Sequence, residues 1–393
     1  MEVFFFYPPT GEIGPLNLII RKGGFNFFWK INGNKDSMPH CFQFSKNFDK
    51  IQLMKEAYLY QKLPHKKVQC RNCPHYCLLE VGQRGKCGVR ENIDGKLFAL
   101  NYQKLIALHI DPIEKKPFYH FLPGTHSLSI ATVGCNFACK SCQNWDISQG
   151  FKKTKEIPGK NIPPEEIVEI ALKNNLPSIS YTYTEPTIFL EYALDTMKLA
   201  KKKGLKNNWV SNGFLSPESA KLVIPYLDAI NIDLKSFSDK FYQEYCGGRL
   251  EPVLETAKLM KKSGVWVEIT TLVIPTLSDS EETFQNIANF IKKELGSETP
   301  WHISQFCGAL SWQLKDLPDT SIETLENAWQ IGKKTGLKYV YLGNAPGHQA
   351  ENTYCPKCNT LVIKRTGYHI ERYDKKGKCP KCNQNLNLTL ASL

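Results

Sequence analysis

The chain has 393 residues, of which 42% are hydrophobic and 22% charged, a globular composition that excludes collagen, a coiled coil and wholesale disorder. Its net charge of +12 comes mostly from the two ends, residues 1–66 and 351–393, where solvated lysines are a commoner explanation than nucleic-acid binding. No apolar run reaches the ~20 residues of a membrane span and no signal peptide is evident, so we expect a cytoplasmic protein with neither membrane nor nucleic acid as partner.

The cysteines narrow the class of protein. Eleven of the 14 fall into three clusters, which leaves Cys41, Cys246 and Cys307 apart from them. A disulfide framework requires a small exported domain, whereas cysteine clusters in a reducing compartment usually bind metal. We therefore expect three metal-binding clusters along one chain.

Residues 1–66 form an N-terminal extension of unassigned function, with a hairpin expected around 25–31. A cysteine-rich module follows over residues 67–100, with the spacing Cys70-x2-Cys73-x3-Cys77-x9-Cys87. Four thiolates at this spacing suit either a zinc ion or an auxiliary iron–sulfur cluster. An auxiliary cluster would relay electrons, whereas zinc would only brace the fold, and the spacing leaves both open.

Strands and helices alternate over residues 101–350. Short apolar or β-branched runs predict strands that begin near Leu128, Ile179, Trp209, Ile230, Trp266, Ile303 and Tyr339. Helical tracts are predicted between them, over 163–174, 187–203, 217–224 (with Ser216 as N-cap), 251–263, 279–295 and 321–335. The repeat length of roughly 30–38 residues predicts an α/β fold, a partial (β/α)6-type TIM barrel short of eight-fold closure.

The loop after the first of these strands carries Cys135, Cys139 and Cys142 at C-x3-C-x2-C spacing, with no fourth cysteine nearby. Four thiolates saturate a [4Fe–4S] cluster, while three leave one iron open to another ligand. A zinc site that borrows a distant fourth ligand is the alternative, but zinc prefers closely spaced ligand pairs.

This triad resembles that of radical S-adenosylmethionine (SAM) enzymes, and its surroundings are similar to the branch that contains the pyruvate formate-lyase activating enzyme. The stretch from Met54 to Lys364 resembles, more closely, the radical SAM member of the AmmeMemoRadiSam system, in the blocks Cys70–Gly88, Leu105–Trp145 and Gly343–Cys355. The resemblance implies a [4Fe–4S] cluster at the triad whose open iron is chelated by SAM. Reductive cleavage of SAM then gives a 5′-deoxyadenosyl radical, which takes a hydrogen atom from the substrate.

The resemblance also implies partners. One partner is an electron donor of the flavodoxin or ferredoxin type. The others are AMMECR1-like or Memo-like proteins, which would present a substrate that the sequence does not identify.

The resemblance also assigns SAM contacts to residues at the ends of the next three strands, namely Glu185, Ser211, Asn212, Asp233 and Lys235. Catalytic groups of such barrels lie at the carboxyl ends of the strands, which is where all five fall. Helix capping or ion pairing is the other explanation for Glu185 or Asp233.

Other residues with possible chemistry have simpler explanations. His302 falls near the start of a strand, the wrong end for catalysis, so we treat it as structural. His109, His120 and His126 are treated as core or loop histidines. Cys246, before Gly247-Gly248, is either a reactive thiol or a buried small side chain.

The tail, residues 351–393, carries Cys355-x2-Cys358 and Cys379-x2-Cys382. Two such knuckles predict a zinc ribbon, with rubredoxin-like iron as the chemical alternative. The tract Gly343–Thr353 joins the last strand directly to the ribbon, which we expect to bring the ribbon to the barrel mouth. With metal-bound modules on both sides of the barrel, we expect a narrowed site, suited to a small molecule or to a substrate presented by a specific partner.

Three functions compete at this stage. The leading one is a radical SAM enzyme that acts on an unidentified substrate. A glycyl-radical activase is the second, and it needs an open mouth to admit a loop of a large partner. The third is a zinc-ribbon protein that binds nucleic acid or senses redox state, which steeply salt-dependent duplex binding would favour and SAM cleavage would exclude.

Overall fold

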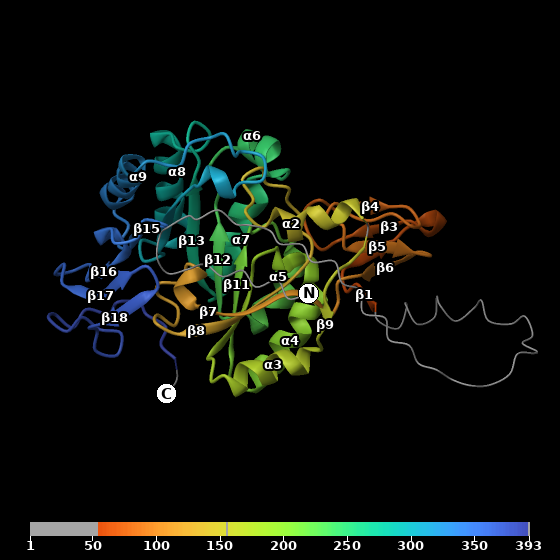
Figure 1. Ribbon diagram of the computed structural model, residues 1–393, viewed down its shortest axis with the longest axis horizontal. Helices are drawn as coiled ribbons and strands as arrows, with labels where there is room; N and C mark the ends of the chain where they lie inside the picture. The colour runs from red at the N-terminus through yellow and green to blue at the C-terminus, as the bar shows by residue number, and fades with distance from the viewer. Residues whose placement is uncertain (1–53, 155, 392–393) are drawn as a thin grey trace, which may run out of the picture. The chain divides into compact units, whose positions relative to one another are not determined.

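Parallel strands make up most of a nine-stranded sheet, whose order is β15-β14-β13-β12-β11-β10-β8-β7-β9. The parallel ones are β8 (His126–Thr132), β10 (Ser178–Tyr181), β11 (Lys206–Ser211), β12 (Ala229–Asp233), β13 (Trp266–Val273), β14 (Trp301–Gln305) and β15 (Val340–Gly343). They lie side by side in the computed structural model (Figure 1), which describes residues 54–154 and 156–391. All the strands predicted for residues 101–350 are confirmed, whereas the hairpin expected around 25–31 lies outside the described residues.

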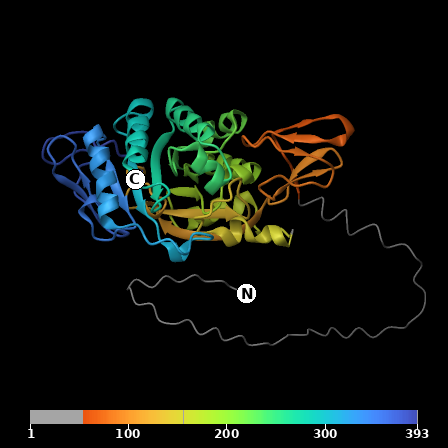
Figure 2. The same cartoon turned by 90° about the horizontal axis from the view of Figure 1, so that it is seen from above.

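Helices connect consecutive parallel strands and flank the sheet (Figure 1, Figure 2). The long ones are α3 (Pro164–Lys173), α4 (Leu190–Lys202), α5 (Pro217–Val223), α7 (Glu251–Lys262), α8 (Glu281–Phe290) and α9 (Ile322–Thr335), which confirms every predicted tract. Ser216, Ser280 and Ser321 cap three of them by accepting the backbone N–H three residues on, a donor that the helix itself leaves unpaired. The shorter α2 (Trp145–Ser148) and α6 (Asp239–Phe241) follow β8 and β12. None of the helices in the described ranges is both long and apolar enough to cross a membrane.

Side chains alternate between the two faces of each strand. Ile179 and Tyr181 of β10 belong to the main apolar core beneath the helices. Ser180 points the other way, where its hydroxyl lies 2.6 Å from Ser127 Oγ and donates to Asn208 Oδ1 at 2.6 Å. The interior of the barrel is therefore lined by hydroxyl and amide groups.

The sequence pattern does not predict β7 (Lys104–Pro112), which pairs antiparallel with β8 and is extended by the short β9 (Lys160–Asn161). Strand alternation is obscured in β7 because the adjacent His109 and Ile110 are both exposed. The chain beyond β7 passes the short 3-10 helix Ile113–Lys115 and crosses the amino-terminal end of the barrel. There the ring of Tyr119 lies 4.9 Å from the ring of Tyr341 on β15, so the sheet curves into an open, partial barrel.

The cysteine-rich module consists of two small sheets. One contains β1 (Lys55–Glu56), β6 (Lys96–Ala99) and β5 (Arg90–Ile93), and the other contains β2 (Tyr60–Lys62), β3 (Val68–Cys70) and β4 (Leu78–Leu79). Because β1 and β2 pair with β6 and β3, the folded module starts at residue 55, earlier than the expected boundary at 67. The module packs at the carboxyl ends of the barrel strands, where His75 Nε2 donates to Asn136 O at 2.8 Å.

The tail folds into β16 (Thr353–Tyr354), β17 (Leu361–Thr366) and β18 (His369–Arg372) and packs at the opposite end of the barrel. His120 Nδ1 donates to Leu386 O at 3.1 Å, and Thr389 N donates to His120 O at 2.9 Å. Arg365 is 2% exposed, donates to Tyr119 O at 3.0 Å and lies 4.0 Å over the Tyr119 ring. The expectation that the tail lies at the mouth is therefore wrong, because these contacts hold it at the amino-terminal end.

Candidate functional site

The central cysteine loop follows β8 at the carboxyl edge of the sheet. Gly134 opens this loop with φ of +108°, and a Cβ at this position would lie 2.9 Å from Val89 Cγ1 and 3.0 Å from Cys87 O. Only glycine adopts this conformation and leaves this space without strain. The loop that carries Cys135 is therefore built in direct contact with the cysteine-rich module.

Backbone hydrogen bonds with the π-helix Tyr242–Cys246 and with the loop after β14 hold the rest of the cysteine loop. Ala138 N and Lys140 N donate to Cys246 O and Tyr245 O, at 2.8 and 2.9 Å. Gln313 N, in the loop after β14, donates to Lys140 O at 2.8 Å. The shape of the cysteine loop thus depends on segments more than 100 residues away in the sequence.

The three thiols of the loop interact electrostatically with one another. Burial raises the pKa of Cys135 and of Cys142, and both interact with Cys139. A hydrogen bond from the Cys246 thiol lowers the pKa of Cys139, and the Lys235 ammonium acts in the same direction. Buried thiolates need compensating positive charge, which bound iron supplies, so this donor set fits an iron–sulfur cluster.

Glu185 joins the carboxyl ends of two strands. It is 2% exposed, and its carboxylate accepts from Ser211 Oγ at 2.8 Å, from Asn212 N at 2.8 Å and from Thr187 Oγ1 at 2.6 Å. It also accepts from Thr187 N and so caps the 3-10 helix Pro186–Phe189. The helix-cap explanation is thus observed, and direct contact between this carboxylate and SAM stays a prediction.

The remaining predicted SAM contacts lie at the same edge. Asn212 Nδ2 donates to Asn136 Oδ1 at 2.8 Å, which ties the end of β11 to the cysteine loop. Asp233 is the last residue of β12 and accepts from Lys235 Nζ at 2.9 Å, so its ion-pair explanation is also observed. The Lys235 charge acts on both Cys139 and Cys246, although the sequence alone gives no reason to connect Cys246 with the site.

A polar cluster that the sequence does not predict lies nearer the amino-terminal end of the barrel, where Asp111 is in register with Ser127 of β8. Asp111 of β7 accepts from Lys116 Nζ at 2.6 Å and from the hydroxyl of Tyr183. Burial lowers the pKa of Lys116 to about 8. Tyr183 has φ of +61°, uncommon for a tyrosine, and Asn144 Nδ2 donates to its carbonyl at 3.0 Å. Asp111 and Lys116 belong to the block Leu105–Trp145 named above, but their partner Tyr183 follows another strand.

His302 is structural, as predicted. Its Nε2 donates to Glu268 Oε2 at 2.6 Å, and the same carboxylate accepts from the N–H groups of Tyr119 and His120, each at 3.0 Å. Burial would raise the pKa of Glu268, but the hydrogen bond from His302 and its charge hold it at about 2. This network lies at the amino-terminal ends of β13 and β14, away from the cysteine loop.

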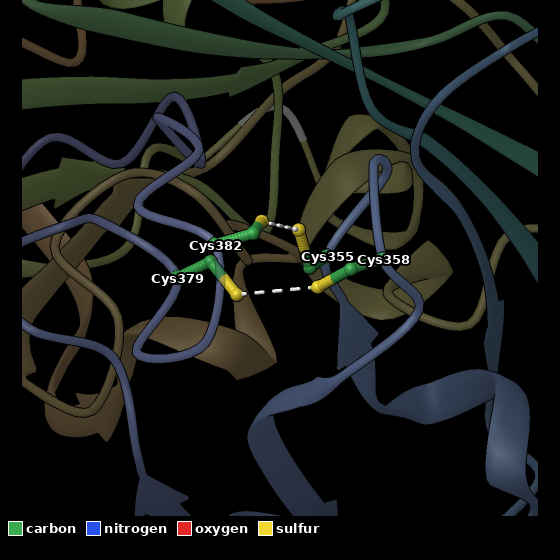
Figure 3. A group of neighbouring side chains, drawn as sticks. All are labelled: Cys355, Cys358, Cys379 and Cys382. Carbon is green, nitrogen blue, oxygen red and sulfur yellow. Dashed lines mark hydrogen bonds between the residues drawn. The ribbon is translucent and has the colours of Figure 1, made fainter.

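Four thiols converge in the tail (Figure 3). Cys355 Sγ lies 3.5 Å from Cys382 Sγ, and Cys358 Sγ lies 3.6 Å from Cys379 Sγ. All four sulfurs lie within 4.8 Å of one another. Sulfurs bound tetrahedrally to one metal ion at about 2.3 Å are about 3.8 Å apart, so this group fits a single ion.

A parallel α/β sheet with a three-cysteine loop after its first parallel strand is typical of a class of iron–sulfur enzymes. Comparisons with known proteins identify this class. The profile of the Radical SAM superfamily matches residues 129–291. The uncharacterized protein MJ0808 of Methanocaldococcus jannaschii is 47% identical over 340 residues, which cover 86% of this chain and 100% of that protein. The chain belongs to the radical SAM superfamily. It is therefore an enzyme that uses a [4Fe–4S] cluster to cleave SAM reductively.

More distant similarity extends to activating enzymes. The pyruvate formate-lyase-activating enzyme of Clostridium pasteurianum is 24% identical over 168 residues, which cover 40% of this chain and 66% of that protein. The crystal structure of a domain of the pyruvate-formate lyase-activating enzyme from Bacteroides vulgatus aligns with a TM-score of 0.38 and 18% identity, covering 42% of this chain and 98% of that one.

Proposed function

We propose that Cys135, Cys139 and Cys142 hold the [4Fe–4S] cluster and that SAM binds the open iron. The observation that carries this proposal is the position of the loop at the carboxyl edge of the sheet. There the Lys235 charge acts on Cys139, and Asn212 is hydrogen-bonded to the loop. Catalytic groups of parallel α/β barrels gather at this edge.

The cluster, when bound, supplies the electron that cleaves SAM, and SAM supplies the radical that takes hydrogen from the substrate. The protein positions and shields these groups. Lys235 keeps a positive charge beside Cys139, while Asp233, with 36% of its side chain exposed, offers a carboxylate oxygen for a hydroxyl or ammonium group of SAM. Glu185 acts as a positioning residue, because its carboxylate holds Asn212 in place.

We propose that the barrel interior beside β7 receives the substrate. Asp111, Lys116 and Tyr183 form the polar cluster, and the ring of His109 lies 5.9 Å from that of Tyr183. Hydroxyl and amide groups such as Asn208 line the interior beyond them. This lining favours a small polar molecule, whose groups can replace the hydrogen bonds of water.

We further propose that the enzyme is the radical SAM member of an AmmeMemoRadiSam system. The support is the sequence resemblance over residues 54–364, whose block Leu105–Trp145 supplies Asp111 and Lys116 to the polar cluster. The partners would be an AMMECR1-like or Memo-like protein that presents the substrate and a flavodoxin- or ferredoxin-type electron donor. Free thiols at every described cysteine are consistent with work in the cytoplasm.

The tail is proposed to be a zinc ribbon. Its close sulfur spacing suits one tetrahedral ion, and zinc is the usual ion for two C-x2-C knuckles. Because the tail packs at the amino-terminal end of the barrel, this zinc would stabilise the fold and take no part in the radical reaction.

Anaerobic reconstitution with iron and sulfide tests the site. The reduced protein should give a [4Fe–4S] EPR signal that changes when SAM is added, together with 5′-deoxyadenosine and methionine as products. The variant C135A/C139A/C142A should lose both the SAM-responsive signal and the products. Cys307→Ala, which removes a cysteine outside all three clusters, is the matched control and should keep both. A SAM-responsive signal that survives in the triple variant would show that the site lies elsewhere.

A glycyl-radical activase is the second candidate, favoured by the similarity to activating enzymes. The sequence predicts that the tail narrows the active-site mouth, which an activase needs open. Because the tail lies at the other end of the barrel, it does not narrow the mouth and is no argument against an activase. The loop after β14 still crosses the cysteine loop, with Trp312 stacked on Trp145 at 6.3 Å between ring centroids. Incubation of the reduced enzyme and SAM with a glycyl-radical protein separates the two functions, because a stoichiometric glycyl doublet would establish the activase.

A further inference from the structure

We propose, building on the site above, that the cysteine-rich module binds a second [4Fe–4S] cluster that passes electrons to the central one. Its ligands would be Cys70, Cys73, Cys77 and Cys87.

The module touches the central cysteine loop on both sides of Cys135. On one side, Cys87 O lies 3.0 Å from the position that a Cβ on Gly134 would take. On the other side, His75 Nε2 donates to Asn136 O at 2.8 Å. A cluster ligated by Cys87 would therefore be a neighbour of one ligated by Cys135.

The spacing of the module's thiols favours a cluster over zinc. The Cys73 thiol interacts electrostatically with those of Cys70, Cys77 and Cys87. Across residues 54–154 and 156–391, however, only the tail has four sulfurs that all lie within 4.8 Å of one another. In a [4Fe–4S] cluster each thiolate binds a different iron, which separates the sulfurs further than one zinc ion does. The central triad shares this wider spacing with the module.

Arg90 places an unpaired N–H group beside the module's cysteines. Its side chain is 1% exposed, and its terminal nitrogens donate to Glu191 at 3.0 and 2.6 Å. Its Nε has no hydrogen-bond partner in the described part of the chain, and its charge acts on Cys70 and Cys87. A buried N–H requires an acceptor, and cluster sulfurs accept such bonds, which tune the reduction potential.

Lys152 lies between the two cysteine groups. Its ammonium interacts with Cys87 of the module and with Cys135 of the central loop. It is held there because it donates to Lys86 O and to Gln149 Oε1, both at 2.7 Å. A positive charge shared by both sites favours the reduced state of both clusters.

The module also offers an entrance for the electron. A hollow of about 880 Å³ opens beside Cys77, and its lining includes Arg84, Lys86 and Lys152 with Glu91. This basic surface fits an acidic, low-potential redox protein of the flavodoxin or ferredoxin type. One electron from that donor would reduce the module's cluster from 2+ to 1+, and its transfer to the central cluster would return the first to 2+.

Metal counting on the full chain tests the proposal. The wild type should hold about eight iron atoms and one zinc, and C135A/C139A/C142A should keep about four iron atoms and an EPR signal that SAM leaves unchanged. A triple variant with two zinc ions and no iron would overturn the second cluster, although a SAM-responsive signal in the wild type would leave the central site standing. A wild type without that response would contradict the central site instead.

The electron route has its own test. In C73A/C77A, the loss of 5′-deoxyadenosine formation should be about tenfold or more greater with a flavodoxin as donor than with dithionite. Lys152→Met should lower the midpoint potential of both clusters in EPR-monitored titrations. Lys153→Met removes the same charge from an exposed neighbour and should leave both potentials unchanged. If C73A/C77A lost the same fraction of activity with both donors, or if K152M kept both wild-type potentials, the relay would be overturned.

Discussion

The two cysteine-rich ends of this chain sit at opposite ends of one barrel, and each of them contacts the barrel through a buried arginine. Arg90 of the N-terminal module pairs with the Glu191 carboxylate of α4 at 2.6 Å. Arg365 of the tail donates to Thr353 Oγ1 at 2.7 Å and to Tyr119 O at 3.0 Å, and it lies over the Tyr119 ring. The Arg90 contact with the barrel is a buried charge pair, whereas Arg365 meets the barrel through a neutral carbonyl and aromatic rings.

This difference has consequences for both stability and function. Removing one member of a buried ion pair leaves the other charged and unpaired, whereas neutral acceptors lose only hydrogen bonds. The N-terminal module touches the central cysteine loop, so substitutions that disturb the module should also lower the rate of SAM cleavage. The tail touches the amino-terminal end of the barrel, so substitutions that disturb the tail should lower only the stability of the protein.

Loss of the metal from the tail should have the largest effect. Cys379→Ser should remove one zinc per chain and unfold the tail, because structural zinc contributes about 10–16 kcal/mol in isolated finger peptides. Reductive SAM cleavage should stay within about twofold of wild type, since the tail lies away from the cysteine loop. Zinc analysis, limited proteolysis and product assays check this. A tail that resists proteolysis without metal would contradict the ribbon assignment.

Breaking the first attachment should come next. Arg90→Met should lower the free energy of unfolding by about 3–5 kcal/mol, because Glu191 would stay buried without its cation. The double variant R90M/E191M should recover much of that loss. Lys96→Met breaks the exposed pair with Glu56 and should cost about 1 kcal/mol or less. Urea unfolding measures all three, and equal losses in the single and double variants would show that the ion pair does not couple the two segments.

The second attachment should be weaker. Arg365→Met should cost about 2–3 kcal/mol, the usual range for lost hydrogen bonds to a charged donor, and should increase proteolysis of the tail. The matched control is Lys364→Met on the same strand, where the lysine is exposed and pairs with Glu371, which is also solvent-accessible. A loss for Arg365→Met as large as that for Arg90→Met would remove the distinction between the two attachments.

The smallest effect concerns pH. Burial lowers the pKa of His120 to about 4, and its Nε2 accepts from the Tyr341 hydroxyl at 2.6 Å. In the unfolded chain His120 binds a proton near pH 6.5, whereas in the folded chain it stays neutral down to about pH 4. The free energy of unfolding is therefore highest above pH 6.5 and falls as the pH drops toward 4. The loss between pH 7 and pH 5 should be about 2 kcal/mol.

Unfolding measurements at pH 7 and pH 5 test this for the tail contact. His120→Gln should flatten the pH dependence, whereas His126→Gln, at an exposed position that opens β8, should leave it unchanged. A His120→Gln variant with the wild-type slope would assign the pH dependence to other groups.

Much of the barrel could be predicted because its signals are local. The parallel strands and long helices follow from apolar runs and periodicity, and the cap at Ser216 follows from its place before a helical tract. β7 was missed because two consecutive exposed residues break its alternation. The location of the predicted SAM contacts could be anticipated, since each lies at the end of a predicted strand. The hydrogen bonds that Glu185 accepts from Ser211 and Asn212 could not, because these two residues lie at the end of a neighbouring strand.

By itself the sequence determined the ligand spacing of the three cysteine clusters, the βα alternation and the helix caps, because each depends on residues only a few positions apart. Only the tertiary structure decided which end of the barrel each module occupies. Arg365 meets Tyr119 across 246 positions, and Tyr183 meets Asp111 across 72. Contacts over such separations depend on how all the intervening strands and helices pack, and no local pattern carries that information.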